Sequence, residues 1–415
     1  MTPDHPASPE PGPIPVTSPG PVPVTAVATA ATVLAVLPIF LLGGLAALVR
    51  AELGFDEARL GVIAGTYFAS SALTAFAAGW LVERVGMQRG YRLGVLMAVV
   101  TLVGIAALAR NWWHLLVLMA VGGLVNSIMQ PAANLAVARG VSARRQGIAF
   151  GVKQAAIPIS TLLAGLSVPL VGLTVGWRWA FAGAAALAVP LYLAVPRAIP
   201  NVAPAAHPPV TAPAAHPPAA VEPRRPLRGL LPATIAIGCA AAAANTLGAF
   251  YVESAAAGGQ PLSRAGLLLS LGSATGITVR LAAGWLADRL DVDPYLLVSV
   301  LLAFGALGYL ALGLGLPTAT LVIATMVVFG AGWGFPGLFH LAVVRANLDA
   351  PAAATGITQT GVFLGSFLGP VGFGWIVSVA GYRAAWTTAA GSAALGASLL
   401  TLDRFRTRRR ARLSR

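Results

Sequence analysis

The chain has 415 residues, of which 57% are hydrophobic and only 10% are charged, and its mean hydropathy is +0.80. Soluble domains carry about 25% charged residues, so this composition excludes an ordinary soluble protein and indicates an integral membrane protein. The formal net charge of +14 is compatible with a nucleic-acid partner. The basic C-terminal run has no interleaved aromatic residue beyond Phe405, however, and we expect no nucleic-acid partner.

The chain begins with a proline-rich stretch, residues 1–24, whose only charged residues are Asp4 and Glu10. It lacks the basic start of a signal peptide, and we expect a disordered tail. Twelve apolar segments follow, each long enough to cross the roughly 30 Å hydrocarbon layer of a membrane as a helix. We place them at 25–49, 58–82, 91–109, 112–138, 146–173, 177–196, 230–254, 263–287, 294–316, 318–344, 353–379 and 383–403.

One long polar connection, residues 198–228, separates the sixth segment from the seventh. It contains the repeated stretch Ala203–Pro209 and Ala212–Pro218, which places two histidines nine residues apart. A proline- and alanine-rich chain has no fixed cage for a metal, so we predict a linker and no metal site. The expected organisation is a tail at 1–24, a six-helix bundle at 25–197, the linker at 198–228, a second bundle at 229–404 and a basic tail at 405–415.

The basic residues predict the orientation in the membrane. Most of the 27 fall in the loops of one side, among them Arg84, Arg89, Arg139, Arg145 and the tail after Arg404. Cytoplasmic loops carry an excess of arginine and lysine. We therefore expect a multi-pass protein of the plasma membrane with both termini and the linker in the cytoplasm.

The two halves of the chain are related by an internal repeat. Gly79–Arg84 reads GWLVER, and Gly284–Arg289, 205 residues further on, reads GWLADR. The same offset relates Arg59 to Arg264, Gly61 to Gly266, Pro131 to Pro336, Gly151 to Gly356, Gln154 to Gln359, Gly176 to Gly381 and Arg178 to Arg383. Two parallel halves in a chain this apolar predict a membrane transporter whose substrate passes between them.

The block Gly79-x-Leu81-x-Glu83-Arg84-x-Gly86-x-x-Arg89 resembles the cytoplasmic signature loop of the major facilitator superfamily, which runs Gly-x-Leu-x-Asp-Arg-x-Gly followed by two basic residues. The resemblance covers residues 25–403. It implies an all-α membrane protein with twelve transmembrane helices in two six-helix pseudo-repeats. The chain departs from the pattern at Glu83, where the family has Asp. It also has Met119 four residues before Gly123, where many proton-coupled members have Arg.

The repeated block is expected to act as a conformational latch. A glycine at position 79 lets two helices approach closely, the Glu83 carboxylate can sit at the positive end of a neighbouring helix, and Arg84 or Arg89 can pair across the halves. The resemblance implies that these contacts hold the outward-open state. The latch residues are Gly79, Glu83, Arg84, Arg89, Gly284, Asp288 and Arg289. The alternative is a solvated turn with arginines that only set the orientation.

Two basic residues, Lys153 and Arg280, lie inside apolar segments, whereas no Asp or Glu lies deep in one; Glu253 is near the outer end of the seventh. Charges within a membrane are rare and usually functional. Arg280 shares a four-residue spacing with Gly272, Gly276 and Gly284, which predicts that it faces another helix. Three interpretations remain open: Lys153 reaches the cytoplasmic surface while Arg280 pairs with Asp288 or a helix end, an anionic substrate supplies the missing charge, or both belong to gating ion pairs.

Uncharged polar residues form the rest of the predicted substrate site. Asn126, Gln130 and Asn134 step by four along one helix face. The other candidates are Gln154, its repeat mate Gln359, and Asn245. For each, a hydrogen bond between helices is the alternative. His340 is a candidate proton relay, with a packed, hydrogen-bonded histidine as the alternative.

The chain has no phosphate-binding Gly-x-x-x-x-Gly-Lys-Ser/Thr loop and no catalytic constellation, so we expect neither an enzyme nor a cofactor. The predicted function is secondary active transport of a small solute by rocker-switch alternating access, with a small organic anion as the favoured substrate. Proton-coupled efflux of hydrophobic drugs is the alternative, and a non-transporting receptor or scaffold on the same fold is the alternative of another class. The expected partners are the small-molecule substrate and the lipid bilayer, and the expected state is a monomer.

Overall fold

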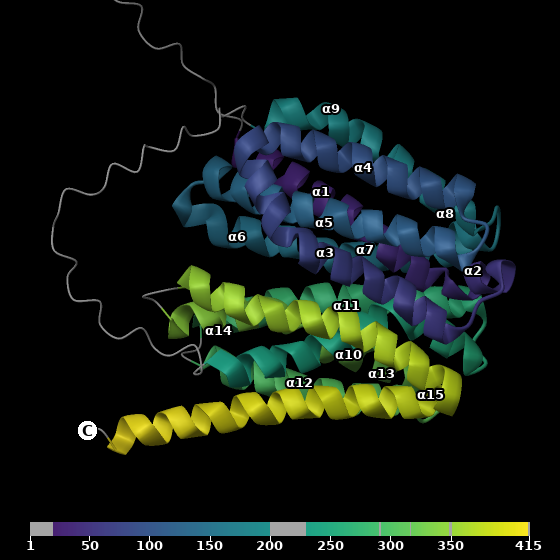
Figure 1. The fold of residues 1–415 in the computed structure, drawn as a ribbon. Coiled ribbons are helices and arrows are strands. Elements are labelled where there is room, and N and C mark those ends of the chain that lie inside the picture. Colours follow the sequence, from purple (N-terminus) through teal and green to yellow (C-terminus); the bar gives the residue numbers. More distant parts are fainter. Residues whose placement is uncertain (1–19, 200–229, 290–291, 316, 348–350, 414–415) are drawn as a thin grey trace, which may run out of the picture.

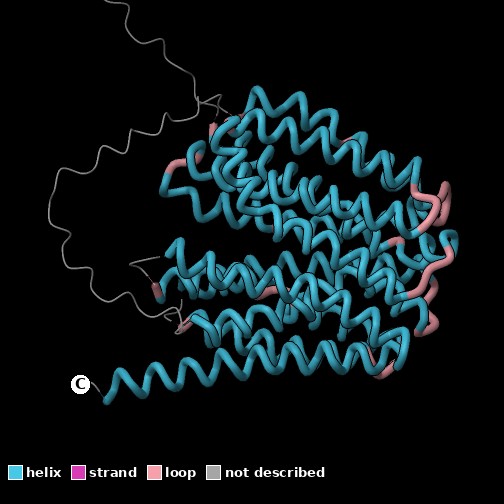
Figure 2. The backbone as a smooth tube through the Cα atoms, in the orientation of Figure 1, coloured by secondary structure: helices cyan, strands magenta, loops and turns pink. Residues whose placement is uncertain are grey.

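The computed structural model describes residues 20–199, 230–289, 292–315, 317–347 and 351–413, and every regular element in these ranges is a helix (Figure 2). The N-terminal half contains α1 (Pro21–Gly44), α2 (Ala46–Leu53), α3 (Glu57–Val85), α4 (Met87–Leu108), α5 (Trp112–Gly140), α6 (Ala143–Gln154), α7 (Ala156–Ser167), the π-helical turn η1 (Val168–Gly172), α8 (Trp177–Ala186) and α9 (Ala188–Ala198). The C-terminal half contains α10 (Leu231–Ala257), α11 (Leu262–Arg289), α12 (Pro294–Leu312), α13 (Thr318–Val327), the π-helical turn η3 (Val328–Gly332), α14 (Pro336–Ala346) and α15 (Pro351–Leu413).

The predicted twelve membrane-spanning segments are confirmed. Eleven stretches of the described chain are long and apolar enough to cross a membrane. The last of them, Ala354–Arg406, supplies two spans because α15 leaves the helical conformation at Gly381, where φ is +78°. Gly176 holds the same place in the first repeat and has a φ of +101°. Both positions need glycine, because other residues rarely adopt a positive φ.

The ends of the first and last helices differ from the prediction. α1 begins at Pro21, so residues 21–24 belong to the helix, since proline is well suited to a first helical turn. α15 continues to Leu413, so most of the predicted basic tail extends the last helix. Most of the predicted N-terminal tail and of the linker lies outside the described residues.

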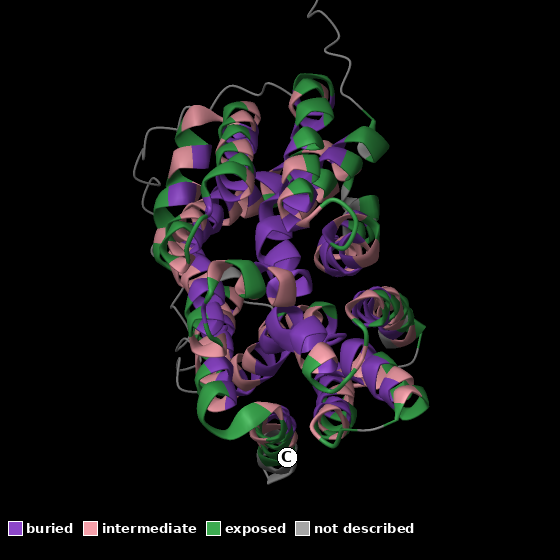
Figure 3. Ribbon diagram, turned by 90° about the vertical axis from the view of Figure 1, so that its right-hand side faces the viewer, coloured by how far each residue is buried: buried purple, intermediate pink, exposed green. Residues whose placement is uncertain are grey.

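The helices of both halves run roughly parallel across the view in Figure 1, the N-terminal half above and the C-terminal half below. We call the side at which α9 ends and α10 begins the linker side, and the side at which α1 and α10 end the opposite side. Buried residues concentrate toward the centre of the molecule, and exposed residues lie along its perimeter (Figure 3). Apolar side chains such as Trp179 and Trp375 are among the exposed ones, as a lipid-facing surface requires.

The halves meet through glycines that follow the internal repeat. Gly43 of α1 packs on the backbone of its own repeat mate, Gly248 of α10. On either side of this contact, Gly61 packs on the carbonyl of Pro370, and the equivalent pair, Gly266 and Gly165, packs in the same way. A Cβ on Gly266 would lie 2.6 Å from the Gly165 oxygen. The two halves are therefore related by a pseudo-two-fold axis. They meet through backbone-to-backbone contacts that larger side chains would block.

These contacts hold the halves together only toward the opposite side. Four glycines nearer the linker side, Gly79, Gly151 and their repeat mates Gly284 and Gly356, have open space where a Cβ would stand. The close glycine contacts between the halves therefore gather toward the opposite side, and the ribbons of the two halves lie farther apart toward the linker side (Figure 1).

Candidate functional site

Lys153 lies near the end of α6 and is only 2% exposed. Its ammonium does not extend to the linker side. It donates to the Gln130 Oε1 and, at 3.0 Å, to the Asn134 Oδ1, both on α5. The predicted polar face of α5 thus receives the buried charge, and the oxygens of two side-chain amides take the place of water around it.

The same face continues the hydrogen bonds toward α3. Gln130 donates from Nε2 to Asn126 Oδ1 at 3.4 Å, and Asn126 donates from Nδ2 to Ser71 Oγ at 2.7 Å. Because the α5 residues are spaced by four, they stand in one row and connect α3, α5 and α6. Three of the predicted site residues, Lys153, Gln130 and Asn126, therefore belong to one network.

Arg280 of α11 faces the interior, as its glycine spacing predicts. Gly272 and Gly276 of the same helix pack against Phe329 of η3. The Arg280 guanidinium donates from Nε and Nη2 to the Trp333 carbonyl, at 3.2 and 2.7 Å. Trp333 lies in the break between η3 and α14, where a helical carbonyl lacks its usual partner.

Arg280 also reaches across to the N-terminal half. Its Nη1 donates to the Gln154 carbonyl at 3.4 Å. That carbonyl would normally accept from the N–H of the residue four positions later, which is Pro158 and has none. The guanidinium thus bridges two interrupted helices, one in each half, and it ends beside the residue that follows Lys153.

Lys153 of the N-terminal half and Arg280 of the C-terminal half therefore both lie close to the break between α6 and α7. Among the described side chains, which do not include that of Asp288, neither Lys153 nor Arg280 has a carboxylate partner. Lys153 is buried and Arg280 is half-buried. Amide and carbonyl oxygens offer only partial negative charge, so these two like charges are left without full compensation.

The other predicted substrate-site residues do not join this network. Asn245 donates to the Ala241 carbonyl at 3.0 Å and to Ser366 Oγ at 2.9 Å, which ties α10 to α15 within the C-terminal half. The side chains of Gln154 and Gln359 make no hydrogen bond with the described residues. His340 is half-buried in α14 and uses Nδ1 in a 2.7 Å bond with the Pro336 carbonyl of its own helix.

Glu83, Arg84 and Arg89, which the sequence predicts to form a latch, make no hydrogen bond or ion pair with the described residues of the other half. Glu83, Arg84 and Arg89 are exposed, and the Asp288 side chain lies outside the described residues. Arg84 stacks 3.8 Å above the Trp80 ring of its own helix, and its repeat mate Arg289 stacks 4.9 Å above Trp285. Cation–π contact gives these arginines a local partner while the halves are apart on the linker side.

The closed, opposite side contains a charged cluster that the sequence reasoning missed. Arg50 of α2 contacts Glu253 of α10 through Nη1, and the same nitrogen lies 2.9 Å from Glu57 Oε1 at the start of α3. Burial acts to lower the pKa of Arg50, but Glu253 and then Glu57 offset it, and the pKa is raised above its ordinary value. Glu253 is 6% exposed and belongs to the other half from Arg50. A lone carboxylate in an otherwise uncharged segment was the signal available in the sequence.

A second ion pair on this side stays within the N-terminal half. Arg178 Nη2 lies 2.8 Å from Glu52 Oε1, and Trp177 donates from Nε1 to Glu52 Oε2 at 2.6 Å. Burial acts to raise the pKa of Glu52, and the hydrogen bonds from Arg178 and Trp177 more than reverse this, so the pKa is lowered. The pair fixes α2 to α8 and does not cross between the halves.

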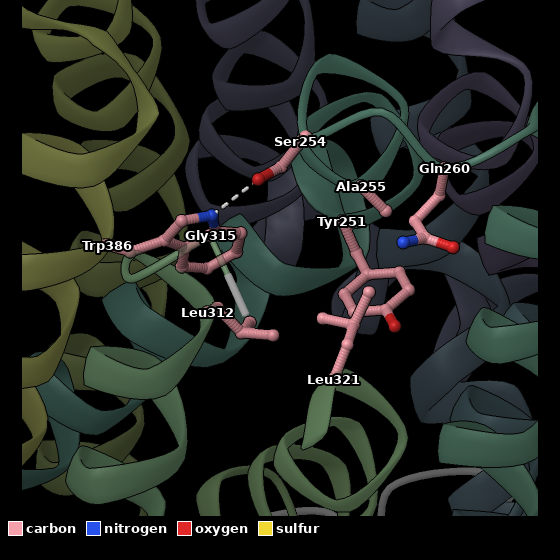
Figure 4. Close-up of a pocket in the computed structure, with 9 residues that line it drawn as sticks. Tyr251, Ser254, Ala255, Gln260, Leu312, Gly315, Leu321 and Trp386 are labelled. Carbon is pink, nitrogen blue, oxygen red and sulfur yellow. Dashed lines mark hydrogen bonds between the residues drawn. The ribbon is translucent and has the colours of Figure 1, made fainter. Parts of the chain in front are cut away.

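A small pocket of about 30 Å³ lies in the C-terminal half near the opposite side (Figure 4). Tyr251, Leu321 and Trp386 line it, and Trp386 donates from Nε1 to Ser254 Oγ at 2.7 Å. The volume has room for about one water molecule. The pocket is enclosed by one half only and is too small for a transported solute.

Twelve apolar helices in two repeats, which meet through glycine contacts and bring a basic residue of each half to their junction, are the architecture of a membrane transporter. The chain belongs to the Major Facilitator Superfamily, whose family model matches residues 28–370. A crystal structure of the nucleoside transporter NupG, in a mutant form, is similar: the TM-score is 0.69 at 14% sequence identity, over 92% of this chain and 99% of that one. At this identity the likeness shows the fold alone. No curated protein matches the sequence.

Proposed function

We propose that the protein is a secondary active transporter that moves a small organic anion across the plasma membrane by rocker-switch alternating access. The observation that carries the proposal is the junction of Lys153 and Arg280, two cations of different halves that have only amide and carbonyl oxygens as described partners. An anion bound between them supplies the missing negative charge.

Both cations keep donors for such a ligand. An ammonium has three N–H groups, of which Lys153 uses two, and a guanidinium has five, of which Arg280 uses three. The remaining N–H groups suit a carboxylate. A nucleoside carries no such charge, so the substrate of NupG is not carried over to this chain.

The arrangement of the halves supports the rocker-switch mechanism. The glycine contacts near the opposite side contain no interlocking side chains, so the halves can pivot against each other there, and the halves lie farther apart toward the linker side. With the basic loops in the cytoplasm, this is an inward-facing state. We further propose that the chain works as a monomer with both termini in the cytoplasm, and that Glu83 and Asp288 belong to the latch that closes the linker side.

The test is uptake by purified protein in liposomes against a panel of small carboxylates and of cationic dyes. Lys153→Gln should weaken carboxylate binding ten- to a hundredfold, because a charge-assisted hydrogen bond is worth roughly 1.5–3 kcal/mol and 1.4 kcal/mol is tenfold. Arg197→Gln, which removes an exposed arginine bonded to its own helix, is the matched control and should leave binding unchanged. Ordinary carboxylate affinity in Lys153→Gln, or uptake of the dyes alone, would overturn the proposal.

A further inference from the structure

The cluster of Arg50, Glu57 and Glu253 joins the two halves at the closed, opposite side. Arg50 and Glu57 come from the N-terminal half, and Glu253 comes from α10 of the C-terminal half. One guanidinium nitrogen, Nη1, contacts an oxygen of each carboxylate, and Nε donates to the Phe55 carbonyl at 2.9 Å. The cluster therefore contains two negative groups and one positive group.

Glu253 has few other neighbours that can take up its charge. The titratable groups that face it are Arg50 of α2, Glu57 of α3 and Tyr382 of α15. Its second oxygen, Oε2, is buried. The Tyr382 hydroxyl faces Glu253 and acts on it as a weak hydrogen-bond donor, but neither group makes a hydrogen bond of normal geometry with a described residue. A buried carboxylate oxygen with so weak a partner is costly while it is ionised and far less so once it carries a proton.

Closing and opening this side change the charge balance of the cluster. When the halves separate here, Arg50 keeps Glu57, which belongs to its own half, and Glu253 faces water as a free carboxylate. When they close, a second carboxylate is brought against the same guanidinium in a largely dry site. Two carboxylates that share one site do not both stay ionised readily, and uptake of one proton restores neutrality.

We propose that the Arg50–Glu57–Glu253 cluster is a proton-binding site that takes up one proton from the solvent as the opposite side closes and releases it as that side opens. The proton is held on a carboxyl oxygen of Glu253, with Glu57 left as the ionised partner of Arg50. The cluster couples the conformational cycle to a proton gradient, and it lies apart from Lys153 and Arg280. This inference needs only that the two halves move, whatever the substrate.

The sign of the pH effect distinguishes this site from a simple ion pair. An ionised pair between Arg50 and Glu253 would hold the side closed at neutral pH and release it on acidification. A cluster that takes up a proton on closing does the reverse, and acid favours closure. The dependence is at most about tenfold in the closed-to-open ratio per pH unit for one proton.

The experiment measures the distance between two spin labels on the opposite side in the full chain, in lipid nanodiscs without substrate. The labels go on Arg110→Cys and Ala319→Cys, one exposed position in each half, in a Cys239→Ala background. Acidification from about pH 8.5 to about pH 5 should increase the short-distance population in the parent chain, because the cluster takes up its proton as the side closes. Glu253→Gln, neutral at every pH, should hold the short distance throughout.

The matched control is Glu52→Gln, which removes a carboxylate of the same side whose partner Arg178 lies in the same half, and it should keep the parent pH response. If Glu253→Gln does not fold, Glu57→Gln serves instead. It leaves Arg50 and Glu253 as a simple ion pair between the halves, so it should lose the closure on acidification and open in acid if it responds at all. A parent chain that opens on acidification, or shows no response, overturns the inference. So does a folded Glu253→Gln or Glu57→Gln variant with the parent response. No substrate is present, so failure here is separate from failure of the anion proposal.

Discussion

Replacing Gly43 by alanine tests whether the glycine contacts hold the opposite side closed. A Cβ at this position would lie 2.9 Å from the Ala249 Cα and 3.1 Å from the Gly248 carbonyl carbon, and closer still to the Gly248 oxygen. These are backbone atoms, which cannot turn away as a side chain does. α1 and α10 must therefore move apart at the pseudo-two-fold axis.

The expected magnitude follows from comparing the two states. Overpacking of this kind costs about 1–3 kcal/mol, and only the closed opposite side carries it. The gain of up to about 1 kcal/mol from alanine over glycine in a helix applies to both states and cancels. The equilibrium should shift toward opening of the opposite side by about 5- to 150-fold.

The assay is the distance between spin labels at Arg110 and Ala319, at a fixed pH. Gly43→Ala should move the population toward the long distance. Gly183→Ala is the control, because Gly183 is an exposed glycine of α8 outside the latch and no atom lies within 4 Å of its Cβ. A Gly43→Ala variant with the parent distribution, or an equal shift from Gly183→Ala, would refute the reasoning.

Three further predictions concern the latch, the orientation and an ion pair. Glu83→Gln combined with Asp288→Asn should slow turnover and leave the affinity of the inward-facing state unchanged, because the latch sets the occupancy of states, and unchanged transport would contradict this. A cysteine at Ala214, in the Cys239→Ala background, should react with a membrane-impermeant thiol reagent only after cell lysis; reaction in intact cells would reverse the predicted orientation. The lowered pKa of Glu52 means that its pair with Arg178 contributes stability above the ordinary carboxyl pKa of 4.5 and loses it as the pH falls through the lowered value. Since the pair is partly exposed and worth at most about 1 kcal/mol, Glu52→Gln should lower Tm by no more than about 2 °C at pH 7 and not at all in acid, and an equal loss at both pH values would count against this.

The spans and the repeat could be predicted because a bilayer allows few solutions. Only helices of about 20 apolar residues satisfy the backbone within it, so hydropathy alone finds them. The offset of 205 residues then relates Gly61 to Gly266, and the structure shows these two making equivalent contacts across the axis. Gly381, where α15 bends, falls between the predicted segments 353–379 and 383–403, because each side of the bend is long enough to cross the bilayer by itself.

The charged cluster on the opposite side could not be predicted, because hydropathy says nothing about which helices are neighbours. Arg50 and Glu253 are 203 residues apart and come from different halves. Their contact depends on how α2 is placed against α10 and on the rotation of each helix. The sequence contained both charges near the ends of apolar segments, but no spacing relates them.

The hydrogen-bond network around Lys153 could be predicted in part. The four-residue row on α5 and the buried Lys153 were found because a helix repeats its faces at that spacing. The partners of Arg280 were not, because backbone carbonyls have no signature of their own in a sequence. Pro158 was the indirect signal: a proline within a span leaves the carbonyl four residues earlier in need of a donor.

Pro158→Ala therefore tests the bridge that Arg280 makes between the halves. Alanine restores an N–H that can bond the Gln154 carbonyl, and this N–H competes with the 3.4 Å bond from Arg280. The bonds to Trp333 stay, so the charge keeps its place while the link to the N-terminal half is weakened. A net hydrogen bond is worth about 0.5–1.5 kcal/mol and this one is long, so the state described here should lose about two- to fivefold in population. The spin-label distance measures that shift, and substrate affinity in the inward-facing state should not change. If Pro158→Ala leaves the distribution unaltered while Arg280→Gln alters it, Arg280 acts on the state through Trp333 and not through the N-terminal half.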